Sequence, residues 1–225
     1  MKSVFIFIFI FLFPLNTFGE RVYIFIPTEH KPVSVEKKFS ENLNGVGVRC
    51  FGSIIDFKKA VEEDTPDAVI TKPQVIPFLS NYTIAMNGTV NGKTTESFFL
   101  LSTGDPLSLN SLDEKNIGIL DFLGRKNIKT FTTTLFDSTP KLKRVKKIAD
   151  LLPLLSMNLV DGVVVSATQA IYIKSRSNLT FTEIKCRKNQ EIAALALSKE
   201  NKAIIEMVKK LPADLTEMIG VDGWN

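Results

Sequence analysis

The sequence predicts an α/β protein built from two similar halves, and three observations lead to this fold class. Apolar, β-branched runs alternate with segments of helical spacing along residues 21–70, the pattern of a parallel sheet with helical crossovers. Residues 102–106 break the alternation, which restarts at residues 117–120. The clearest strand, residues 160–165, is apolar throughout and follows a short helical run, as expected for a strand buried on both faces.

The first 19 residues have the layout of a secretory signal peptide. Lys2 precedes an apolar run over residues 4–15, and Thr17 and Gly19 supply small residues before a cleavage point. A transmembrane helix needs about 20 apolar residues, so the run is short for one, although an uncleaved membrane anchor is the alternative. We therefore expect an exported, periplasmic protein whose mature chain begins at residue 20.

The composition of the mature chain limits the classes of function. Removing Lys2 leaves 27 of the 28 basic residues against 24 acidic ones, a net charge of +3 that is spread along the chain. Such a charge gives no strong case for nucleic acid binding. One histidine and two cysteines argue against a metal cluster built by the protein. We expect no metal and no cofactor.

The first half of the mature chain reads as five strands and two helices. The strands are expected at residues 21–26, 46–51, 66–70, 82–86 and 97–101, and the helices at residues 35–43 and 53–63. Each helix carries apolar residues on one face. Threonines and glycines in residues 87–94 indicate a turn region between the last two strands.

The second half repeats the alternation. The strands are expected at residues 117–120, 142–145, 160–165, 178–184 and 191–197, and the helices at residues 151–157, 170–173 and 200–211. Residues 127–136 stay ambiguous, because their threonines favour a strand and their place in the alternation favours a helix. Asp150 is expected to cap the helix that follows it.

These features together resemble a known family. The signal peptide, the two halves, the break near residues 103–106, the strand Asn116-Ile-Gly-Ile-Leu120 and the helix followed by Leu159-Val-Asp-Gly-Val-Val-Val165 are similar to periplasmic substrate-binding proteins of the two-lobed type 2 kind. The phosphate- and phosphonate-binding branch is the best match. One departure is the loop Asp121-Phe-Leu-Gly-Arg125, which stands where such phosphonate binders usually have a loop rich in serine and threonine. Asp121 would repel an oxyanion, and Arg125 would offset that charge.

The resemblance implies a two-lobed α/β fold in which each lobe is a mostly parallel sheet flanked by helices. Lobe 1 would comprise residues 20–102 plus 187–225, and lobe 2 residues 103–186. The chain would leave lobe 1, build lobe 2 and return, so the strand at residues 191–197 is expected in the first sheet. The ligand would lie between the lobes, and hinge closure over it would carry the signal.

Candidate ligand-binding residues occupy the loops that follow predicted strands, where ligands dock in open α/β sheets. They are Thr28, Thr71, Lys72, Gln74, Asp121, Arg125, Ser166, Thr168 and Gln169. Hydroxyls and amides at helix N-termini suit an anion or an amino-acid-like ligand. The alternative is that these are ordinary loop and cap residues.

No catalytic group is predicted. His30 lies beside Lys31 and Pro32, which favours a solvated loop residue over a general base. Ser166 lacks the Gly-x-Ser-x-Gly setting of a hydrolase nucleophile. An enzyme on the same fold is therefore the least favoured reading.

Two further features leave alternatives open. Cys50 and Cys186 allow either a disulfide, which an exported chain permits, or two buried free thiols. A basic run reads as a solvated face in preference to a contact with an anionic membrane or an acidic partner. The run consists of Lys141, Lys143, Arg144, Lys146 and Lys147.

The sequence thus predicts an exported solute-binding protein without enzymatic activity. It would be a monomer that captures a small polar ligand, which could be an anion. It would present that ligand to the permease of an ABC transporter or to a membrane sensor. The rival hypothesis is a binding-protein fold kept as an interaction or sensory module with its cleft filled by side chains. The bulky pair Phe122-Leu123, the short chain and the basic run favour that rival.

Overall fold

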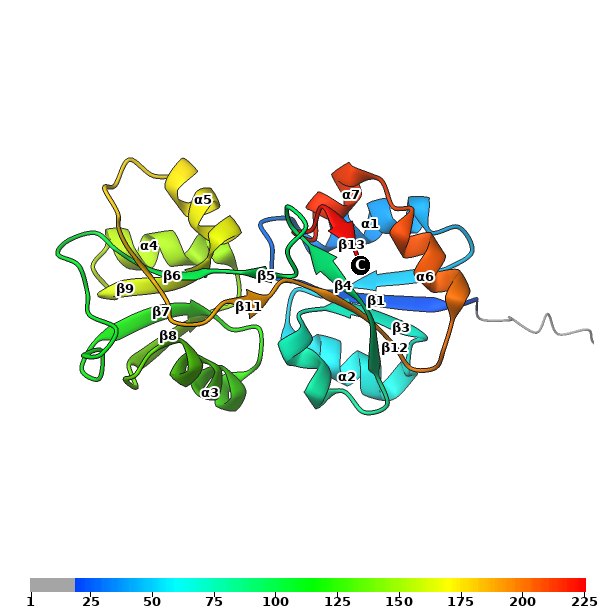
Figure 1. Ribbon diagram of the computed structural model, residues 1–225, viewed down its shortest axis with the longest axis horizontal. Helices are drawn as coiled ribbons and strands as arrows, with labels where there is room; N and C mark the ends of the chain where they lie inside the picture. Colours follow the sequence, from blue (N-terminus) through cyan, green and yellow to red (C-terminus); the bar gives the residue numbers. More distant parts are fainter. Residues whose placement is uncertain (1–18) are drawn as a thin grey trace, which may run out of the picture.

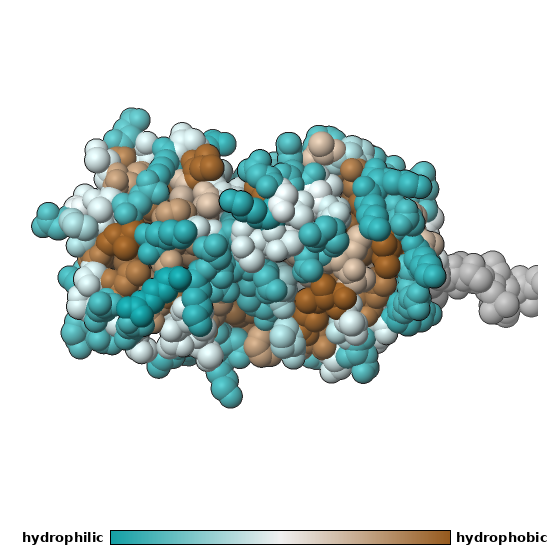
Figure 2. Space-filling model, in the orientation of Figure 1, coloured by the Kyte–Doolittle hydropathy of each residue, from teal (hydrophilic) through white to brown (hydrophobic). Residues whose placement is uncertain are grey.

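The computed structural model describes residues 19–225, and these form two α/β bodies that lie side by side along the long axis of the molecule (Figure 1). Residues 1–18 of the predicted signal peptide lie outside the described residues. Across residues 19–225, none of the helices is long and apolar enough to cross a membrane. On the face in Figure 2, hydrophilic residues dominate and apolar residues gather in separate patches over each body.

The first body is built on a six-stranded sheet. Its strands, in spatial order, are β13 (Gly223–Trp224), β4 (Thr83–Thr89), β12 (Ala194–Leu197), β3 (Ala68–Thr71), β1 (Arg21–Phe25) and β2 (Gly47–Cys50). β1 pairs in parallel with β2 and β3, whereas β12 pairs antiparallel with β3 and β4. The place of β12 confirms that the chain returns to the first sheet after building the second.

Helices cover both faces of the first sheet. They are α1 (Pro32–Asn42), α2 (Ile54–Asp64), the 3-10 helix η1 (Pro73–Phe78), α6 (Lys202–Lys209) and α7 (Ala213–Glu217). Successive residues of β1 point to opposite faces, so Tyr23 and Phe25 pack with α2 while Val22 and Ile24 pack with α1, α6 and α7. β1 is therefore buried on both sides from Val22 to Phe25, in agreement with the apolar character of these residues.

The second body is built on a five-stranded sheet. Its strands, in spatial order, are β10 (Thr182–Lys185), β6 (Phe98–Ser102), β9 (Gly162–Ser166), β7 (Asn116–Leu120) and β8 (Lys141–Val145). β7 pairs in parallel with β8 and β9, and β6 pairs antiparallel with β9 and β10. The helix α3 (Arg125–Leu135) covers one face, and α4 (Leu151–Ser156) and α5 (Ala167–Ser175) cover the other.

Two of the sequence expectations need correction here. The strand β6 was expected in the first sheet, but it pairs only with strands of the second, so the chain changes sheet before Phe98 and not after Ser102. Asp150 makes no side-chain cap at α4. The 3-10 helix η2 (Ile148–Asp150) directly precedes α4, so Asp150 is already in the helical region and lacks the extended backbone of a capping residue.

The ambiguous segment at residues 127–136 is the helix α3. Ile128, Phe131 and Leu135 are buried on one face at helical spacing. The hydroxyls of Thr132 and Thr133 donate to the carbonyls of Lys129 and Thr130, at 2.7 Å each. These local bonds satisfy the threonines within the helix, so their preference for strands is overridden by burial of the apolar face.

Two extended segments connect the bodies. The short strands β5 (Thr95–Glu96) and β11 (Gln190–Glu191) pair antiparallel as a ribbon of their own, and Figure 1 shows them between the two sheets. The first segment leads from β4 into β6, and the second leads from β10 back to β12. The connection is thus a two-stranded ribbon, and such connecting segments are where hinge motions between lobes occur.

Candidate functional site

The loops at the carboxyl ends of strands from both bodies meet in a cleft. In the first body they are residues 26–32 after β1 and residues 50–52 at the end of β2. In the second they are residues 120–121 at the end of β7 and residues 146–149 after β8. Together with Met218 and Ile219 they enclose a cavity of about 320 Å³, called the large cavity below. Parallel strands bring these loops together because their carboxyl ends meet at one edge of each sheet.

The floor of the large cavity is apolar. Its main side chains are Phe25, Ile26, Phe51, Leu120, Ile148 and Ile219. Phe25 and Phe51 are held by Phe57 of α2, with ring centroids 5.4 and 5.7 Å from the Phe57 ring. The aromatic part of the floor is therefore fixed by packing within the first body.

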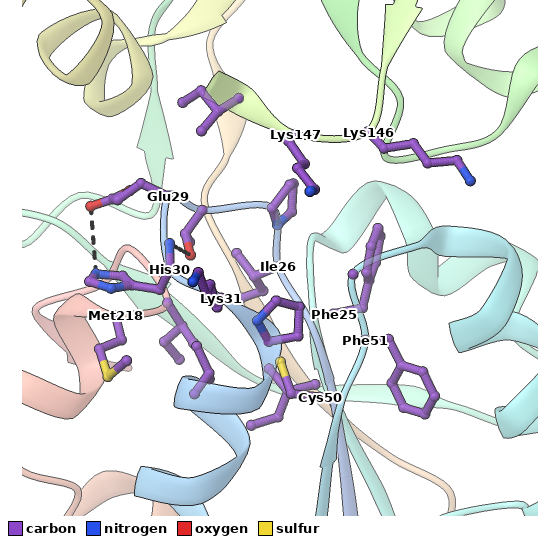
Figure 3. A pocket seen from close by; sticks show the side chains of 18 of the residues that line it. Phe25, Ile26, Glu29, His30, Lys31, Cys50, Phe51, Lys146, Lys147 and Met218 are labelled. Atoms are coloured by element: carbon purple, nitrogen blue, oxygen red, sulfur yellow. Dashed lines mark hydrogen bonds and ion pairs between the residues drawn. The ribbon is translucent and has the colours of Figure 1, made fainter. Parts of the chain in front are cut away.

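The rim of the large cavity carries an excess of positive charge. Lys31 comes from the loop after β1, and Lys146 and Lys147 come from the loop after β8 in the second body (Figure 3). All three side chains are exposed, and in the part of the chain that the structure describes none of them forms an ion pair.

The two acidic residues that line the large cavity differ in their contacts. The Glu29 carboxylate lies 3.6 Å from Nε2 of the adjacent His30, which is longer than a hydrogen bond, as Figure 3 shows. The Asp121 carboxylate pairs with Arg144 and accepts a 2.7 Å hydrogen bond from the Gly124 amide. Arg144, and not Arg125 as the sequence suggested, therefore offsets the charge of Asp121.

A smaller polar pocket of about 50 Å³ adjoins the large cavity. Both are lined by residues 26–29 and by Ile219. The remaining charged and polar side chains of the pocket come from four parts of the chain: Lys72 after β3, Glu96 of the connecting ribbon, Glu217 of α7, and Ser166, Thr168 and Gln169 at the start of α5.

Three polar side chains of this pocket, Lys72, Glu96 and Thr168, bind one another. Lys72 is only 5% exposed, and its Nζ donates to Oε1 of Glu96 at 3.1 Å and to the carbonyl of Ile192 at 3.0 Å. The other carboxylate oxygen of Glu96 accepts a 3.5 Å hydrogen bond from Oγ1 of Thr168 in the second body. A buried ammonium needs such partners, because an unpaired buried charge is very costly.

The start of α5 is also satisfied internally. Oγ of Ser166 accepts from the amide of Gln169 at 3.4 Å, and Oε1 of Gln169 accepts from the amide of Ser166 at 3.1 Å. This is a complete capping box. The oxygen atoms of the two side chains thus serve as acceptors that stabilise the start of the helix.

The structure brings together some of the nine candidate residues and not others. Thr28, Lys72, Ser166, Thr168 and Gln169 line the polar pocket, and Thr28 and Asp121 line the large cavity. That these residues contact a ligand stays a prediction.

Thr71, Gln74 and Arg125 line neither space. Thr71 is buried and donates to the carbonyl of Phe25 at 2.8 Å. Nε2 of Gln74 lies 3.4 Å from Oε1 of Gln190, and Arg125 is exposed at the start of α3. The side chains of Thr71 and Gln74 therefore make contacts within the protein and do not face the cleft.

Sequence reasoning missed the residues that dominate the large cavity. Phe25 ends β1 and Phe51 directly follows β2, and their apolar character indicated only a core position. Lys146 and Lys147 were read as part of a solvated basic face. They follow the strand β8 directly, so the strand-end rule that selected the other candidates would have selected them too.

The bulky pair Phe122-Leu123 does not fill the cleft. Both side chains are buried in the second body, and the Phe122 ring packs edge-on against Phe131 of α3 with centroids 5.1 Å apart. This part of the argument for a filled cleft is therefore wrong.

Both cysteines are free thiols, so the disulfide alternative is not realised. Cys50 lines the large cavity at the end of β2, whereas Cys186 follows β10 of the second sheet and is 2% exposed. Burial, followed by the nearby Glu36 carboxylate, raises the pKa of the Cys50 thiol to about 12, and burial raises the pKa of the Cys186 thiol to about 12. Both are neutral at ordinary pH.

Comparison with known proteins shows the fold. No protein-family model matches the chain, and no curated protein matches its sequence. Among solved structures, it is similar to the VFT2 domain of BvgS from Bordetella pertussis, at 10% identity and a TM-score of 0.62, covering 89% of this chain and 91% of that one. It is also similar to the GluR0 ligand-binding core in complex with L-glutamate, at 15% identity and a TM-score of 0.58, covering 91% and 97%.

A third similar structure is the periplasmic aliphatic sulphonate-binding protein SsuA from Escherichia coli, at 12% identity and a TM-score of 0.58, covering 89% of this chain and 72% of that one. The matches span nearly the whole chain, both bodies included. The protein therefore has the two-lobed type 2 fold of periplasmic binding proteins, and its two bodies are called lobes from here on.

Proposed function

We propose that this protein is an exported solute-binding protein that closes its two lobes over a small ligand in the large cavity. The observation that carries the proposal is the large cavity itself, about 320 Å³ in volume and lined by strand-end loops of both lobes. A ligand that touches both walls binds the closed form better than the open form and so shifts the molecule toward closure. We propose no catalytic activity.

The proposed partner is a membrane transporter or a membrane sensor. The similar structures include a protein named as a periplasmic binding protein and a domain of BvgS. With a transporter or with a sensor, the closed two-lobed form would be the form that the membrane protein recognises. The predicted signal peptide supports a periplasmic location. We propose that the protein acts as a monomer, because the cleft is complete within one chain.

The proposed ligand is small and anionic. The sequence resemblance favours a phosphate- or phosphonate-like ligand, and the unpaired lysines at the rim of the large cavity support an anion. The polar pocket offers less support, because Ser166 and Gln169 already bind each other there.

A ligand screen on the chain from residue 20 tests this function. The panel contains phosphate, methylphosphonate, aliphatic and aromatic carboxylates and sulfonates, amino acids and sugars. A true ligand raises the melting temperature progressively with its concentration, and small-angle X-ray scattering should then show a smaller radius of gyration. If no member of the panel shifts the melting temperature or compacts the protein, the proposal is wrong.

A second candidate is favoured by one specific observation, the Lys72–Glu96 pair that occupies the polar pocket. In this reading the protein is an interaction or sensory module whose cleft holds no ligand. Absence of any response in the same screen, together with capture of a membrane protein by the immobilised chain, would favour it.

A further inference from the structure

We propose that the ligand is an organic anion with an apolar body, which rests on the floor of the large cavity while its negative group pairs with Lys31 and Lys147. This inference rests on the binding function proposed above and narrows it to one class of ligand. A carboxylate, a sulfonate and a phosphonate share the head-group chemistry that the site requires.

The apolar floor of the large cavity indicates that the ligand has an apolar body. Phe25, Phe51, Ile148 and Ile219 present rings and aliphatic groups from both lobes. A sugar or another highly hydroxylated ligand would leave hydroxyls without partners against this surface, which is costly. An aromatic or branched aliphatic body gains roughly 25 cal/mol for each Å² of apolar surface that it removes from water.

The size of the body follows from the volume. At about 320 Å³, the large cavity lies at the lower end of the range of about 300–1,000 Å³ that is usual for small-molecule sites. It has room for a ligand built on about one ring.

The lysines at the rim of the large cavity indicate that the ligand carries a negatively charged group. Lys31 belongs to lobe 1 and Lys147 to lobe 2, and Figure 3 shows the Lys147 side chain directed from the second lobe toward the first. An anion held between them would contact both lobes only in the closed form. Its binding energy would therefore favour closure directly.

The same geometry selects against a zwitterion. The ammonium of an α-amino acid is one carbon away from its carboxylate, so a carboxylate between Lys31 and Lys147 would place the ammonium beside the same two lysines. Asp121, an acid of the second lobe in the large cavity, is already paired with Arg144. Repulsion between like charges therefore disfavours an amino acid relative to the simple acid.

Four matched probes test the class of ligand by isothermal titration calorimetry. 3-Phenylpropanoate carries the ring and the negative group, propanoate lacks the ring, 3-phenylpropan-1-ol lacks the charge, and L-phenylalanine adds only the ammonium. We expect 3-phenylpropanoate to bind at least about tenfold more tightly than each of the others, since about 1.4 kcal/mol corresponds to a factor of ten.

A variant locates the head group. Lys147→Met keeps an unbranched side chain of nearly the same length and removes its charge, and it should weaken binding of 3-phenylpropanoate by about fivefold or more. Lys126→Met is the matched control, because Lys126 is exposed on α3 and does not line the cavity; its affinity should be unchanged.

The outcomes separate this inference from the function on which it rests. If L-phenylalanine binds as tightly as 3-phenylpropanoate, the protein is a binding protein but the inference is wrong. Equal binding of the alcohol, or no effect of Lys147→Met, contradicts the head-group pairing. If none of the four probes binds, the inference is overturned, and the broader panel then decides whether the binding function also fails.

Discussion

The two ends of the cleft differ although they share a wall. Residues 26–29 and Ile219 border both the polar pocket and the large cavity. At the polar end, Lys72, Glu96 and Thr168 bind one another and leave about 50 Å³. At the apolar end, the rings of Phe25 and Phe51 pack against Phe57. A volume of about 320 Å³ remains open there.

This difference shows what kind of wall a ligand site needs. Buried charges must be paired, so a polar cleft tends to be completed by the protein's own side chains. Apolar side chains need no hydrogen-bonding or charged partner, so a cavity that they line can remain open until a ligand fills it. In this protein the strand-end polar residues mainly stabilise the fold, and the open space lies beside apolar residues.

The largest effect on stability is expected from Lys72→Met at the polar end. The change leaves the Glu96 carboxylate buried and without its cation, so the free energy of unfolding should fall by about 3–5 kcal/mol. Urea denaturation followed by circular dichroism measures the loss. Lys59→Met is the control, because its exposed pair with Glu63 should contribute less than about 1 kcal/mol.

The double variant Lys72→Met, Glu96→Leu sharpens this test. It removes both charges together, and we expect its free energy of unfolding to return to within about 2 kcal/mol of the wild type, because a buried ion pair contributes little relative to apolar residues. A double variant as unstable as Lys72→Met alone would show that the carbonyl of Ile192, and not Glu96, is the main partner of Lys72.

Alkaline pH should destabilise the protein through its two thiols, one at the apolar end and one in the core. Burial raises the pKa values of Cys50 and Cys186 from 9.0 to about 12. Below pH 9 the folded and unfolded states both keep the protons, so this stability is fully present. As the pH rises toward 12, the unfolded chain releases protons that the folded chain retains, and the stability is lost.

Denaturation at about pH 8 and about pH 10 measures this loss. The variant Cys50→Ser, Cys186→Ser should lose less stability between the two conditions than the wild type. An equal loss in the variant and the wild type would place the alkaline sensitivity elsewhere, and Tyr82 is the next candidate because burial raises its pKa to about 12.

A moderate effect is expected from Ser166→Ala at the start of α5. The change removes the acceptor of the Gln169 amide and should lower the free energy of unfolding by about 0.5–2 kcal/mol. Because Ser166 is a cap and not a ligand contact in this account, the affinity for 3-phenylpropanoate should stay unchanged. A large loss of affinity with no loss of stability would show that Ser166 contacts the ligand and that the ligand lies at the polar end.

The smallest effect is expected from Thr168→Val. The hydroxyl of Thr168 is exposed and lies 3.5 Å from Oε2 of Glu96, so its hydrogen bond is weak and its loss should cost less than about 1 kcal/mol. Urea denaturation again measures the change. A loss comparable to that of Lys72→Met would mean that the contact between the lobes is a major source of stability.

Much of the fold followed from the sequence, because the alternation of apolar strands and amphipathic helices is a local signal. The strand at residues 98–102 was assigned to the wrong sheet, since its run Phe-Phe-Leu-Leu indicates burial but not the neighbouring strand. The short elements η1, α7 and β13 were not predicted. They lack the length over which periodicity can be recognised.

The site was predictable in position but less so in chemistry. The strand-end rule placed Thr28, Lys72 and Thr168 in the cleft, and the structure brings them together in the polar pocket. Glu96, the shared partner of Lys72 and Thr168, lies 24 residues from Lys72 in a connecting segment with no pattern that would indicate a binding role. Local sequence therefore could not show that these polar groups satisfy one another.

The central claim is that the ligand occupies the apolar end of the cleft, and blocking each end in turn tests it most directly. Ala149 is exposed and lines the large cavity, so Ala149→Trp should fill that space. Ala203→Trp, on the exposed face of α6, is the control. The double variant Lys72→Met, Glu96→Leu alters only the polar end.

Calorimetric titration with 3-phenylpropanoate should show no binding to Ala149→Trp, and near wild-type affinity for both Ala203→Trp and the polar-end double variant. Loss of binding in the double variant, with binding retained in Ala149→Trp, would contradict the account and place the ligand at the polar end.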